Sequence, residues 1–167
     1  MESSKLAKEL VIRSAETQDT PLILSFIQEL AEYEKLSHQV VATEAKLRES
    51  LFCAESPAHV LIAEYGKNPA GFAVYYFNYS TFLAQPGLYL EDLYVRPDLR
   101  GKGIGRALLA EVARLARKHN CPRVEWAVLD WNEPAIRFYH DLGATALEEW
   151  TLFRLMDSAL ENVAANA

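Results

Sequence analysis

The chain has 167 residues, which is enough for one domain with a sizeable hydrophobic core. Hydrophobic residues make up 50% of it and charged residues 24%, as in a soluble globular protein, and no apolar run reaches the roughly 18 residues of a bilayer span. The formal net charge of −6 argues against nucleic-acid binding, because that function needs a broad basic surface.

The first half of the chain predicts a strand, two helices and a hairpin. Asp19 and Pro21 have the order of a helix cap and a first-turn proline, and apolar residues follow at helical spacing. Gly66 and Pro69 mark a turn between two apolar runs of strand length. The predicted elements are a strand at 10–14, helices at 19–35 and 43–52, and strands at 58–65 and 70–79.

The second half alternates strands and helices. An apolar strand ends before three glycines, and Gly103 begins a helix whose apolar residues recur every three or four positions. Asn132 and Pro134 have the order of a helix start, and Gly143 ends that helix. The predicted elements are strands at 88–95, 124–129 and 151–155, and helices at 103–119 and 132–142.

The predicted elements follow the order β-α-α-β-β-β-α-β-α-β. Only the second half has helices between neighbouring strands, so the order predicts an α/β domain with a mixed, mostly antiparallel central sheet flanked by helices. No linker, repeat or low-complexity tract divides the chain. One domain is therefore expected over residues 10–156, with terminal tails at 1–9 and 157–167.

Glycines at 101, 103 and 105 lie between the strand and the helix, an arrangement that can bind an anion. They let the backbone turn tightly, and the helix adds unpaired N–H groups and the positive end of its dipole. Their spacing fits neither the P-loop nor the dinucleotide-binding pattern, which disfavours an NTPase or an NAD-binding protein. A plain turn is the more common use of such glycines. However, the acidic pair Glu91 and Asp92 before the loop and a second segment near residue 139 favour a phosphate site here. Residues 91–123 also carry eight Lys or Arg against four Asp or Glu in an otherwise acidic chain, which suits a polyanionic ligand.

Two separated segments resemble those of the GCN5-related N-acetyltransferases, the GNAT family. Residues 100–105, R-G-K-G-I-G, resemble its R/Q-x-x-G-x-G/A segment, and residues 138–144, F-Y-H-D-L-G-A, resemble its F-Y-x-x-x-G-[FA] segment. The resemblance implies the GNAT fold and acetyl-CoA as cosubstrate, with the pyrophosphate at the glycine loop. It also implies that Tyr139 protonates the departing coenzyme A thiolate and that Asn132 contacts coenzyme A. The cofactor-binding residues so implied are Leu93, Tyr94, Val95, Arg100, Gly101, Lys102, Gly103, Ile104, Gly105, Arg106, Asn132, Pro134 and Ala135.

Glu91 and Asp92 lie in the middle of the apolar strand at 88–95. Successive side chains of a strand point to opposite faces, so the two carboxylates are expected on opposite sides of the sheet, with at least one in the cleft. An acid in such a strand is a functional candidate, and a salt-bridged structural acid is the alternative for both. A primary ammonium has a pKa near ~10.4 and must lose a proton before it attacks a thioester. Glu91, acting through a water, is the predicted proton acceptor, and a backbone N–H of residues 93–95 is the predicted donor to the oxyanion.

Further segments resemble the diamine acetyltransferase branch of the family, which includes spermidine/spermine and thialysine acetyltransferases. They are residues 30–34 (L-A-E-Y-E), 71–77 (G-F-A-V-Y-Y-F), 89–92 (Y-L-E-D) and 131–139 (W-N-E-P-A-I-R-F-Y). The resemblance implies acetyl transfer to a primary amine of a small cation, such as a diamine, a polyamine or a thialysine-like amino acid. Ser80 stands where the polyamine enzymes have an Asp, which disfavours tight polyamine binding, and the segment Glu148-Glu149-Trp150 partly restores the acidity. The substrate-contacting residues so implied are Tyr33, Glu34, Glu91, Asp92, Trp126 and Glu149.

Two other functions stay open: a GNAT enzyme that acetylates proteins or peptides, and a non-catalytic sensor that binds acetyl-CoA. The presence of both Glu91 and Tyr139 argues against the sensor. The resemblance also implies a homodimer, with the final strand and residues 148–150 near the interface. No metal, nucleic-acid or membrane partner is expected. Cys53 and Cys121 lack metal-ligand spacing and the first residues lack the apolar core of a secretion signal, so a cytoplasmic location is expected.

Overall fold

The computed structural model of the protein describes residues 9–165. These residues form two compact units, 9–127 and 128–165. The first unit contains the whole β-sheet, and the second contains the last two helices. The single domain expected over residues 10–156 stays a prediction.

The first unit is built on a five-stranded sheet with the order β1-β2-β3-β4-β5. Neighbouring strands are antiparallel except β4 and β5, which are parallel. The prediction of a mixed, mostly antiparallel sheet is therefore confirmed. The strands are β1 (Leu10–Ser14), β2 (His59–Tyr65), β3 (Asn68–Ser80), β4 (Gln85–Val95) and β5 (Val124–Glu125).

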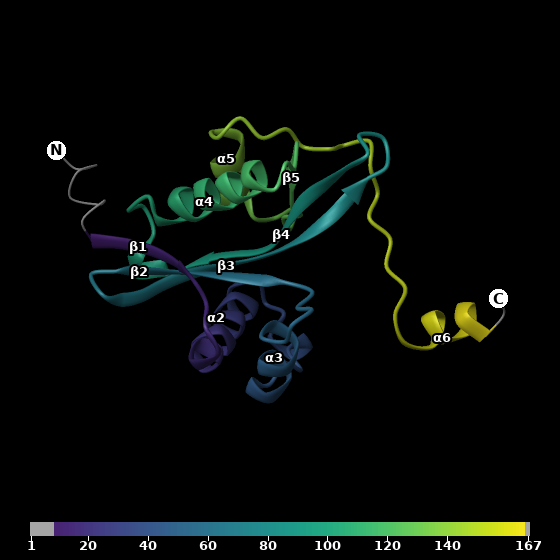
Figure 1. The fold of residues 1–167 in the computed structure, drawn as a ribbon, viewed down its shortest axis with the longest axis horizontal. Helices are drawn as coiled ribbons and strands as arrows, with labels where there is room; N and C mark the ends of the chain where they lie inside the picture. The colour runs from purple at the N-terminus through teal and green to yellow at the C-terminus, as the bar shows by residue number, and fades with distance from the viewer. Residues whose placement is uncertain (1–8, 166–167) are drawn as a thin grey trace. The chain divides into compact units, whose positions relative to one another are not determined.

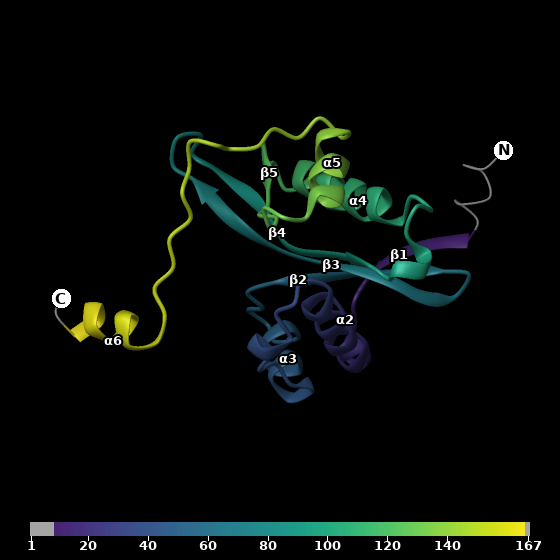
Figure 2. The ribbon, with the colours of Figure 1, turned by 180° about the vertical axis from the view of Figure 1, so that it is seen from behind.

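Helices cover both faces of this sheet. The pair α2 (Thr20–Tyr33) and α3 (Glu44–Leu51) lies on one face, and α4 (Ile104–Lys118) lies on the other (Figure 1, Figure 2). All three lie within the predicted ranges or differ from them by a residue or two at their ends. Short 3-10 turns precede or connect these elements: η1 (Thr17–Asp19), η2 (Ser37–Gln39) and η3 (Pro97–Leu99).

Each face of the sheet has its own apolar core. On the α2 face, Phe26 stacks on Phe72 with ring centroids 5.3 Å apart, and Tyr94 packs against both rings. On the other face, α4 buries an apolar stripe spaced by four residues, as its sequence predicts. Burying one such large apolar side chain stabilises the fold by about 1.5–3 kcal/mol, so β4 is held firmly from both sides. The stripe consists of Ile104, Leu108 and Val112.

The C-terminal segment differs from the prediction. The strand expected at 151–155 is wrong, because residues 151–156 have no regular structure and Leu152 and Phe153 are 78% and 88% exposed. A strand needs partners for its backbone N–H and C=O groups, and no strand among the described residues pairs with this segment. The tail expected at 157–167 contains a helix, α6 (Asp157–Ala165), whose Ala, Leu and Glu residues have high helix propensity.

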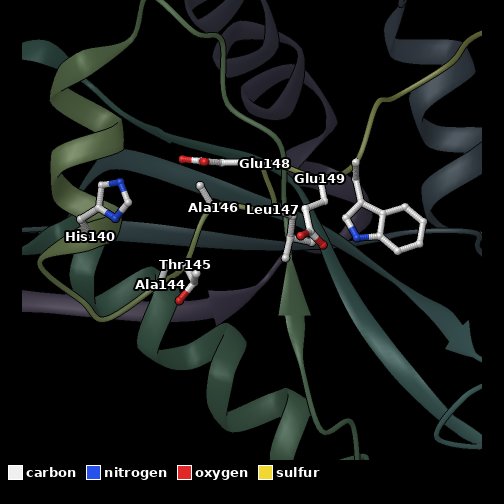
Figure 3. Close-up of a pocket in the computed structure, with 8 residues that line it drawn as sticks. His140, Ala144, Thr145, Ala146, Leu147, Glu148 and Glu149 are labelled. Atoms are coloured by element: carbon white, nitrogen blue, oxygen red, sulfur yellow. The ribbon is translucent and has the colours of Figure 1, made fainter.

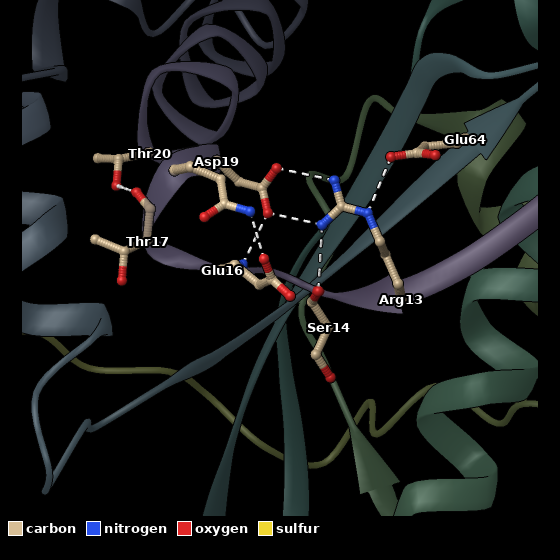
Figure 4. A network of polar contacts seen from close by, with 8 residues as sticks. Arg13, Ser14, Glu16, Thr17, Asp19, Thr20 and Glu64 are labelled. Carbon is tan, nitrogen blue, oxygen red and sulfur yellow. Dashed lines mark hydrogen bonds and ion pairs between the residues drawn. The ribbon is translucent and has the colours of Figure 1, made fainter.

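An ion-pair network ties β1 to the start of α2 and to β2 (Figure 4). Arg13 donates from Nη1 and Nη2 to the two carboxylate oxygens of Asp19 at 2.7 and 2.8 Å, and from Nε to Glu64 at 2.9 Å. The Asp19 carboxylate also accepts a hydrogen bond from the backbone N–H of Glu16. Asp19 is buried, and the hydrogen bonds from Arg13 hold its pKa below the ordinary value. Asp19 precedes α2 as predicted, but its side chain binds this network instead of capping the helix.

Replacing Arg13 by Gln is expected to lower the free energy of unfolding by about 1–3 kcal/mol at neutral pH, because it leaves the buried Asp19 carboxylate without its partner. Since the folded-state pKa of Asp19 is lowered, the stabilisation is present above the ordinary Asp pKa near ~3.9 and is lost as the pH falls through the lower folded-state value. Urea unfolding at neutral and acidic pH measures both effects.

The control for this prediction is Arg48→Gln, because the ion pair between Arg48 and Glu44 is exposed. Such i,i+4 pairs contribute only about 0.3–0.5 kcal/mol. The Arg13 network would have no special role if the two variants lost the same stability at neutral pH.

Candidate functional site

The loop between β4 and α4 has the backbone of an anion-binding turn. Gly101 and Gly103 have φ angles of 76° and 78°, in the left-handed region that favours glycine. Gly103 is the cap residue of α4, and no side-chain hydrogen bond caps this helix end. The first N–H groups of α4 are therefore open to a ligand at the positive end of the helix dipole. The predicted sequence of strand, glycine loop and helix is confirmed, although Gly105 lies inside α4.

The basic residues expected near this loop do not all serve it. Arg96 donates two hydrogen bonds of 2.8 and 3.1 Å to the carboxylate of Glu29, so its charge is neutralised. Lys102 and Arg106 are exposed, and the Lys102 ammonium lies 5.3 Å from the centroid of the Tyr65 ring. The positive field at the loop therefore comes from Arg100, Lys102, Arg106 and the helix end.

Arg100 joins the loop to the end of α2. Its guanidinium carbon lies 4.4 Å from the ring centroid of Tyr33 and 5.8 Å from that of Tyr94. Its Nε also donates a hydrogen bond of 2.9 Å to the carbonyl of Val95. Tyr33 is the last residue of α2, and Glu34 follows it as the C-cap. The structure thus brings the predicted substrate pair Tyr33 and Glu34 beside the predicted cofactor loop.

A β-bulge at Glu91 breaks the alternation of side chains on β4. Leu90 pairs with Tyr75 on β3 and Asp92 pairs with the next residue, Val74, so Glu91 is an extra residue on β4. Paired residues on antiparallel strands point to the same face of a sheet. The expectation that alternation carries Glu91 and Asp92 to opposite faces assumed an unbroken strand, and the bulge removes that premise.

The bulge places Tyr89 and Asp92 on the α2 face, although they are three positions apart in the sequence. Tyr89 pairs with Tyr76 and Asp92 pairs with Val74, and these two partners are two residues apart on β3. Val74 packs in the core cluster of α2, which identifies the face. Burial and then the charge of Glu91 raise the pKa values of the Tyr76 and Tyr89 hydroxyls, so Glu91 lies close to the same group of side chains.

Asp92 is the carboxylate with the most altered acidity. Its burial, and after it the charges of Glu91 and Glu34, raise its pKa to about 7. Burial also raises the pKa of Glu34. These three acids are predicted site residues, whereas Tyr76 and Tyr89, whose ring centroids are 5.2 Å apart, are not. A tyrosine within a strand is a weak sequence signal of a binding site, because only the strand register shows that it lies on the same face as an acid. The arrangement gathers acidic and aromatic groups, which together attract a cation.

The strand β5 is shorter than the predicted strand at 124–129. It pairs with β4 only at Leu88 and Tyr89, since the bulge at Glu91 bends β4. Beyond Tyr89, this edge of β4 has no strand partner among residues 9–165. Trp126, a predicted substrate contact, follows β5 directly and is half-buried.

The open edge of β4 carries the predicted contacts at residues 93–95. Alternate backbone N–H groups on this stretch point away from β3 and are available to a ligand. The side chain of Tyr94 is not available to a ligand, because its ring is in the core and its hydroxyl donates a hydrogen bond of 3.2 Å to Glu29. Leu93, Tyr94 and Val95 can therefore serve a cofactor or an oxyanion through their backbone.

Ser80, the last residue of β3, is buried and accepts hydrogen bonds from two neighbouring groups. It is 4% exposed, and its hydroxyl accepts hydrogen bonds from Arg123 Nη1 at 3.4 Å and from the Leu83 N–H at 3.3 Å. The residue predicted to stand where the polyamine enzymes have an Asp is therefore hydrogen-bonded to Arg123 and Leu83.

In the second unit, α5 (Glu133–His140) carries Tyr139 in its last turn. The Asn132 side chain accepts a hydrogen bond of 3.4 Å from the Ala135 N–H, and Pro134 lies in the first turn. The predicted cap and start of this helix are confirmed, and Gly143 follows its end with a φ of 86°. The roles of Asn132, Pro134 and Ala135 toward a cofactor, and of Tyr139 as an acid, stay predictions.

The second unit also has a hollow of about 530 Å³ after α5 (Figure 3). It is lined by His140 and residues 144–150, which include Glu148 and the predicted substrate residue Glu149. Figure 3 shows the Glu148 side chain extending toward the side on which His140 lies. The hollow therefore gathers two carboxylates, which gives this unit an acidic surface of its own.

Two kinds of feature are not found in the part of the chain that the structure describes. No group of three or more His, Cys, Asp or Glu side chains there has the arrangement of a metal site. No helix among these residues combines the length and the apolar composition that a membrane crossing needs.

Comparison with known proteins gives the same family as the residues above. Residues 26–144 match the Acetyltransferase (GNAT) family. The chain is 41% identical to thialysine N-epsilon-acetyltransferase of Bos taurus over 166 residues, which is 93% of this chain and 97% of that one. It is 33% identical to L-ornithine N5-acetyltransferase of Arabidopsis thaliana, covering 91% and 86% of the two chains. An integron cassette protein of V. cholerae has a similar structure, with a TM-score of 0.78, 27% identity and coverage of 93% and 98%.

The family match runs from the middle of α2 to just beyond α5, and so includes the glycine loop, the strand β4 with its two acids, and Tyr139. Relatives that are similar over nearly the whole chain include enzymes named as thialysine N-epsilon-acetyltransferase and L-ornithine N5-acetyltransferase. The protein is therefore an acetyltransferase enzyme that belongs to the GNAT family, within its diamine acetyltransferase branch.

Proposed function

We propose that the protein transfers the acetyl group of acetyl-CoA directly to a primary amine of a small cationic substrate. One observation carries this proposal. The strand β4 has a bulge with Glu91 and Asp92 near its middle and leads, within a few residues, into the glycine loop before α4. A group that recognises a cation and a group that binds phosphate thus belong to one continuous segment.

The glycine loop and the edge of β4 fit the cosubstrate. The left-handed Gly101 and Gly103 and the uncapped start of α4 suit a pyrophosphate, and the exposed Lys102 and Arg106 add positive charge. Backbone N–H groups of residues 93–95 suit the rest of an extended ligand. When bound, acetyl-CoA supplies an acyl thioester. The role of the protein is to bind this thioester and to remove a proton from the ammonium of the acceptor.

The acids on β4 are proposed to accept the proton of the ammonium. Glu91, through a water, is the proposed acceptor, and Asp92 lies beside it with a pKa raised to about 7 by burial and by the charges of Glu91 and Glu34. A base is most effective when its pKa is near the working pH, so this pair suits a reaction at neutral pH. Once the amine has attacked, an N–H of residues 93–95 holds the oxyanion. Tyr139 is proposed to donate its hydroxyl proton to the departing thiolate.

The acceptor is proposed to be a short diamine or a diamino acid. Support comes from the relatives named for thialysine and L-ornithine, and from Ser80, which provides no carboxylate for a longer polyamine. Tyr33, Glu34, Trp126 and Glu149 are the other proposed substrate contacts.

A homodimer in the cytoplasm is also proposed. The segment after the hollow carries large exposed apolar side chains that a second copy can cover. Both cysteines are free thiols, which suits a reducing compartment. The exposed side chains are Trp150, Leu152, Phe153, Leu155 and Met156.

The test is a thiol-release assay with acetyl-CoA and a panel of acceptors. Thialysine, ornithine and putrescine are expected to give the highest kcat/KM, spermine a lower value and a basic peptide the lowest. Turnover of the peptide alone would identify a protein acetyltransferase. Binding of acetyl-CoA without turnover of any amine would identify the sensor, and both results contradict the proposal.

A further inference from the structure

We propose that the stack of Arg100 on Tyr33 couples the two halves of the site, so that the cofactor and the amine each strengthen the binding of the other. This inference rests on the proposed function. It assigns Arg100 and Tyr33 a positioning role in addition to any direct contact with the ligands.

The geometry of the stack carries the inference. The guanidinium of Arg100 lies 4.4 Å from the ring centroid of Tyr33, within the range of a cation–π contact, and its Nε is fixed by the 2.9 Å hydrogen bond to Val95. Arg100 directly precedes Gly101, the first left-handed residue of the loop. Tyr33 directly precedes Glu34, and the left-handed Lys35, with a φ of 62°, ends the helix there. The stack thus joins the first residues of the loop to the last residues of α2.

The ion pair between Arg96 and Glu29, one helical turn earlier on α2, is a stronger contact than the stack of Arg100 on Tyr33. Glu29 and Tyr33 are four residues apart on α2, and Arg96 and Arg100 are four residues apart after β4. The pair of Arg96 and Glu29 is half-buried and joined by two hydrogen bonds, with the Tyr94 hydroxyl as a third donor to Glu29. The Arg100 side chain is exposed. The inner pair therefore anchors α2 to the sheet, and the outer stack can form or loosen with the loop.

The expected coupling follows from linkage. If the loop is ordered around a phosphate, Arg100 is held over Tyr33, and Glu34 is held where an amine meets it. An exposed cation–π contact corresponds to about a two- to fivefold change in an equilibrium constant. Linkage requires that the amine strengthen cofactor binding by the same factor.

The experiment measures the dissociation constant of coenzyme A by calorimetry, with and without saturating thialysine, so that no reaction occurs. The ratio of the two constants is expected to be about two to five in the unmodified protein. It should fall to about one in Tyr33→Leu and in Arg100→Gln, and the double variant should show no further change. Tyr33→Phe keeps the ring and should keep the ratio.

Each outcome of this experiment decides a separate claim. A ratio of one in the unmodified protein, or an unchanged ratio in Tyr33→Leu and Arg100→Gln, overturns the coupling while leaving acetyl transfer intact. Failure of the unmodified protein to bind coenzyme A, or to acetylate any amine, instead overturns the proposed function. Thermal unfolding of each variant shows whether it is folded, and the ratio is read only from folded variants.

Discussion

Replacing Tyr139 by Phe is expected to lower kcat for acetyl transfer by a factor of ~10²–10⁴, which is the usual contribution of a general acid. The substitution removes only the hydroxyl, so the ring keeps its packing at the end of α5. Because the proton is transferred only in the transition state, kcat and kcat/KM should fall together while KM stays near its original value. Steady-state thiol release with the best amine of the panel measures both constants.

A matched control is available in the first unit. Tyr79 on β3 is exposed and has no proposed role, so Tyr79→Phe should leave kcat and KM unchanged. Wild-type kcat in Tyr139→Phe would remove Tyr139 from the role of the acid. A rise in the KM for acetyl-CoA with unchanged kcat would show that the hydroxyl binds the cofactor and does not protonate the thiolate.

Substitution of the acids on β4 is expected to change both the rate and its dependence on pH. Glu91→Gln removes the proposed proton acceptor and should lower kcat/KM by a factor of ~10²–10⁴. In the unmodified enzyme, kcat/KM should rise as the pH increases through about 7, because the raised pKa of Asp92 leaves this carboxyl protonated below that pH. Asp92→Asn should remove this rise and leave only the increase that comes from deprotonation of the amine at higher pH.

The pH profiles of the two variants identify the proton acceptor. Burial and the charges of Glu91 and Glu34 raise the pKa of Asp92, so the inflection near pH 7 is assigned to Asp92 and should be lost in Asp92→Asn. If Glu91→Gln keeps the wild-type rate and profile, and Asp92→Asn loses activity at every pH, then Asp92 is the base. Glu44→Gln on the exposed surface of α3 is the control and should behave as the unmodified enzyme.

The elements that the sequence predicted correctly depend on neighbours along the chain. Two left-handed glycines before an amphipathic run produce the loop and the start of α4, and Asn132 with Pro134 produces the start of α5. Each feature needs only a few adjacent residues, because a cap or a turn is a local hydrogen-bonding problem. The family resemblance rested on these same segments, and the match over residues 26–144 confirms it.

The elements that the sequence predicted wrongly depend on partners far along the chain. The strand expected at 151–155 has suitable side chains, but a strand forms only when another backbone pairs with it. The strand expected at 124–129 stops at Glu125, because its neighbour β4 bulges at Glu91. Neither the missing partner strand nor the bulge can be read from the sequence of residues 151–155 or 124–129.

The sequence by itself determined the family, the glycine loop before α4 and the identity of the acids, since each is encoded in a short run of residues. Only the tertiary structure decided how these groups are arranged. The register of β3 against β4 made Glu91 an extra residue and placed Asp92 with Tyr89 on the α2 face. The packing of α2 on the sheet brought Tyr33 under Arg100, and burial raised the pKa of Asp92. The physical reason is that strand register, burial and long-range contacts are set by the whole fold, whereas caps and turns are set locally.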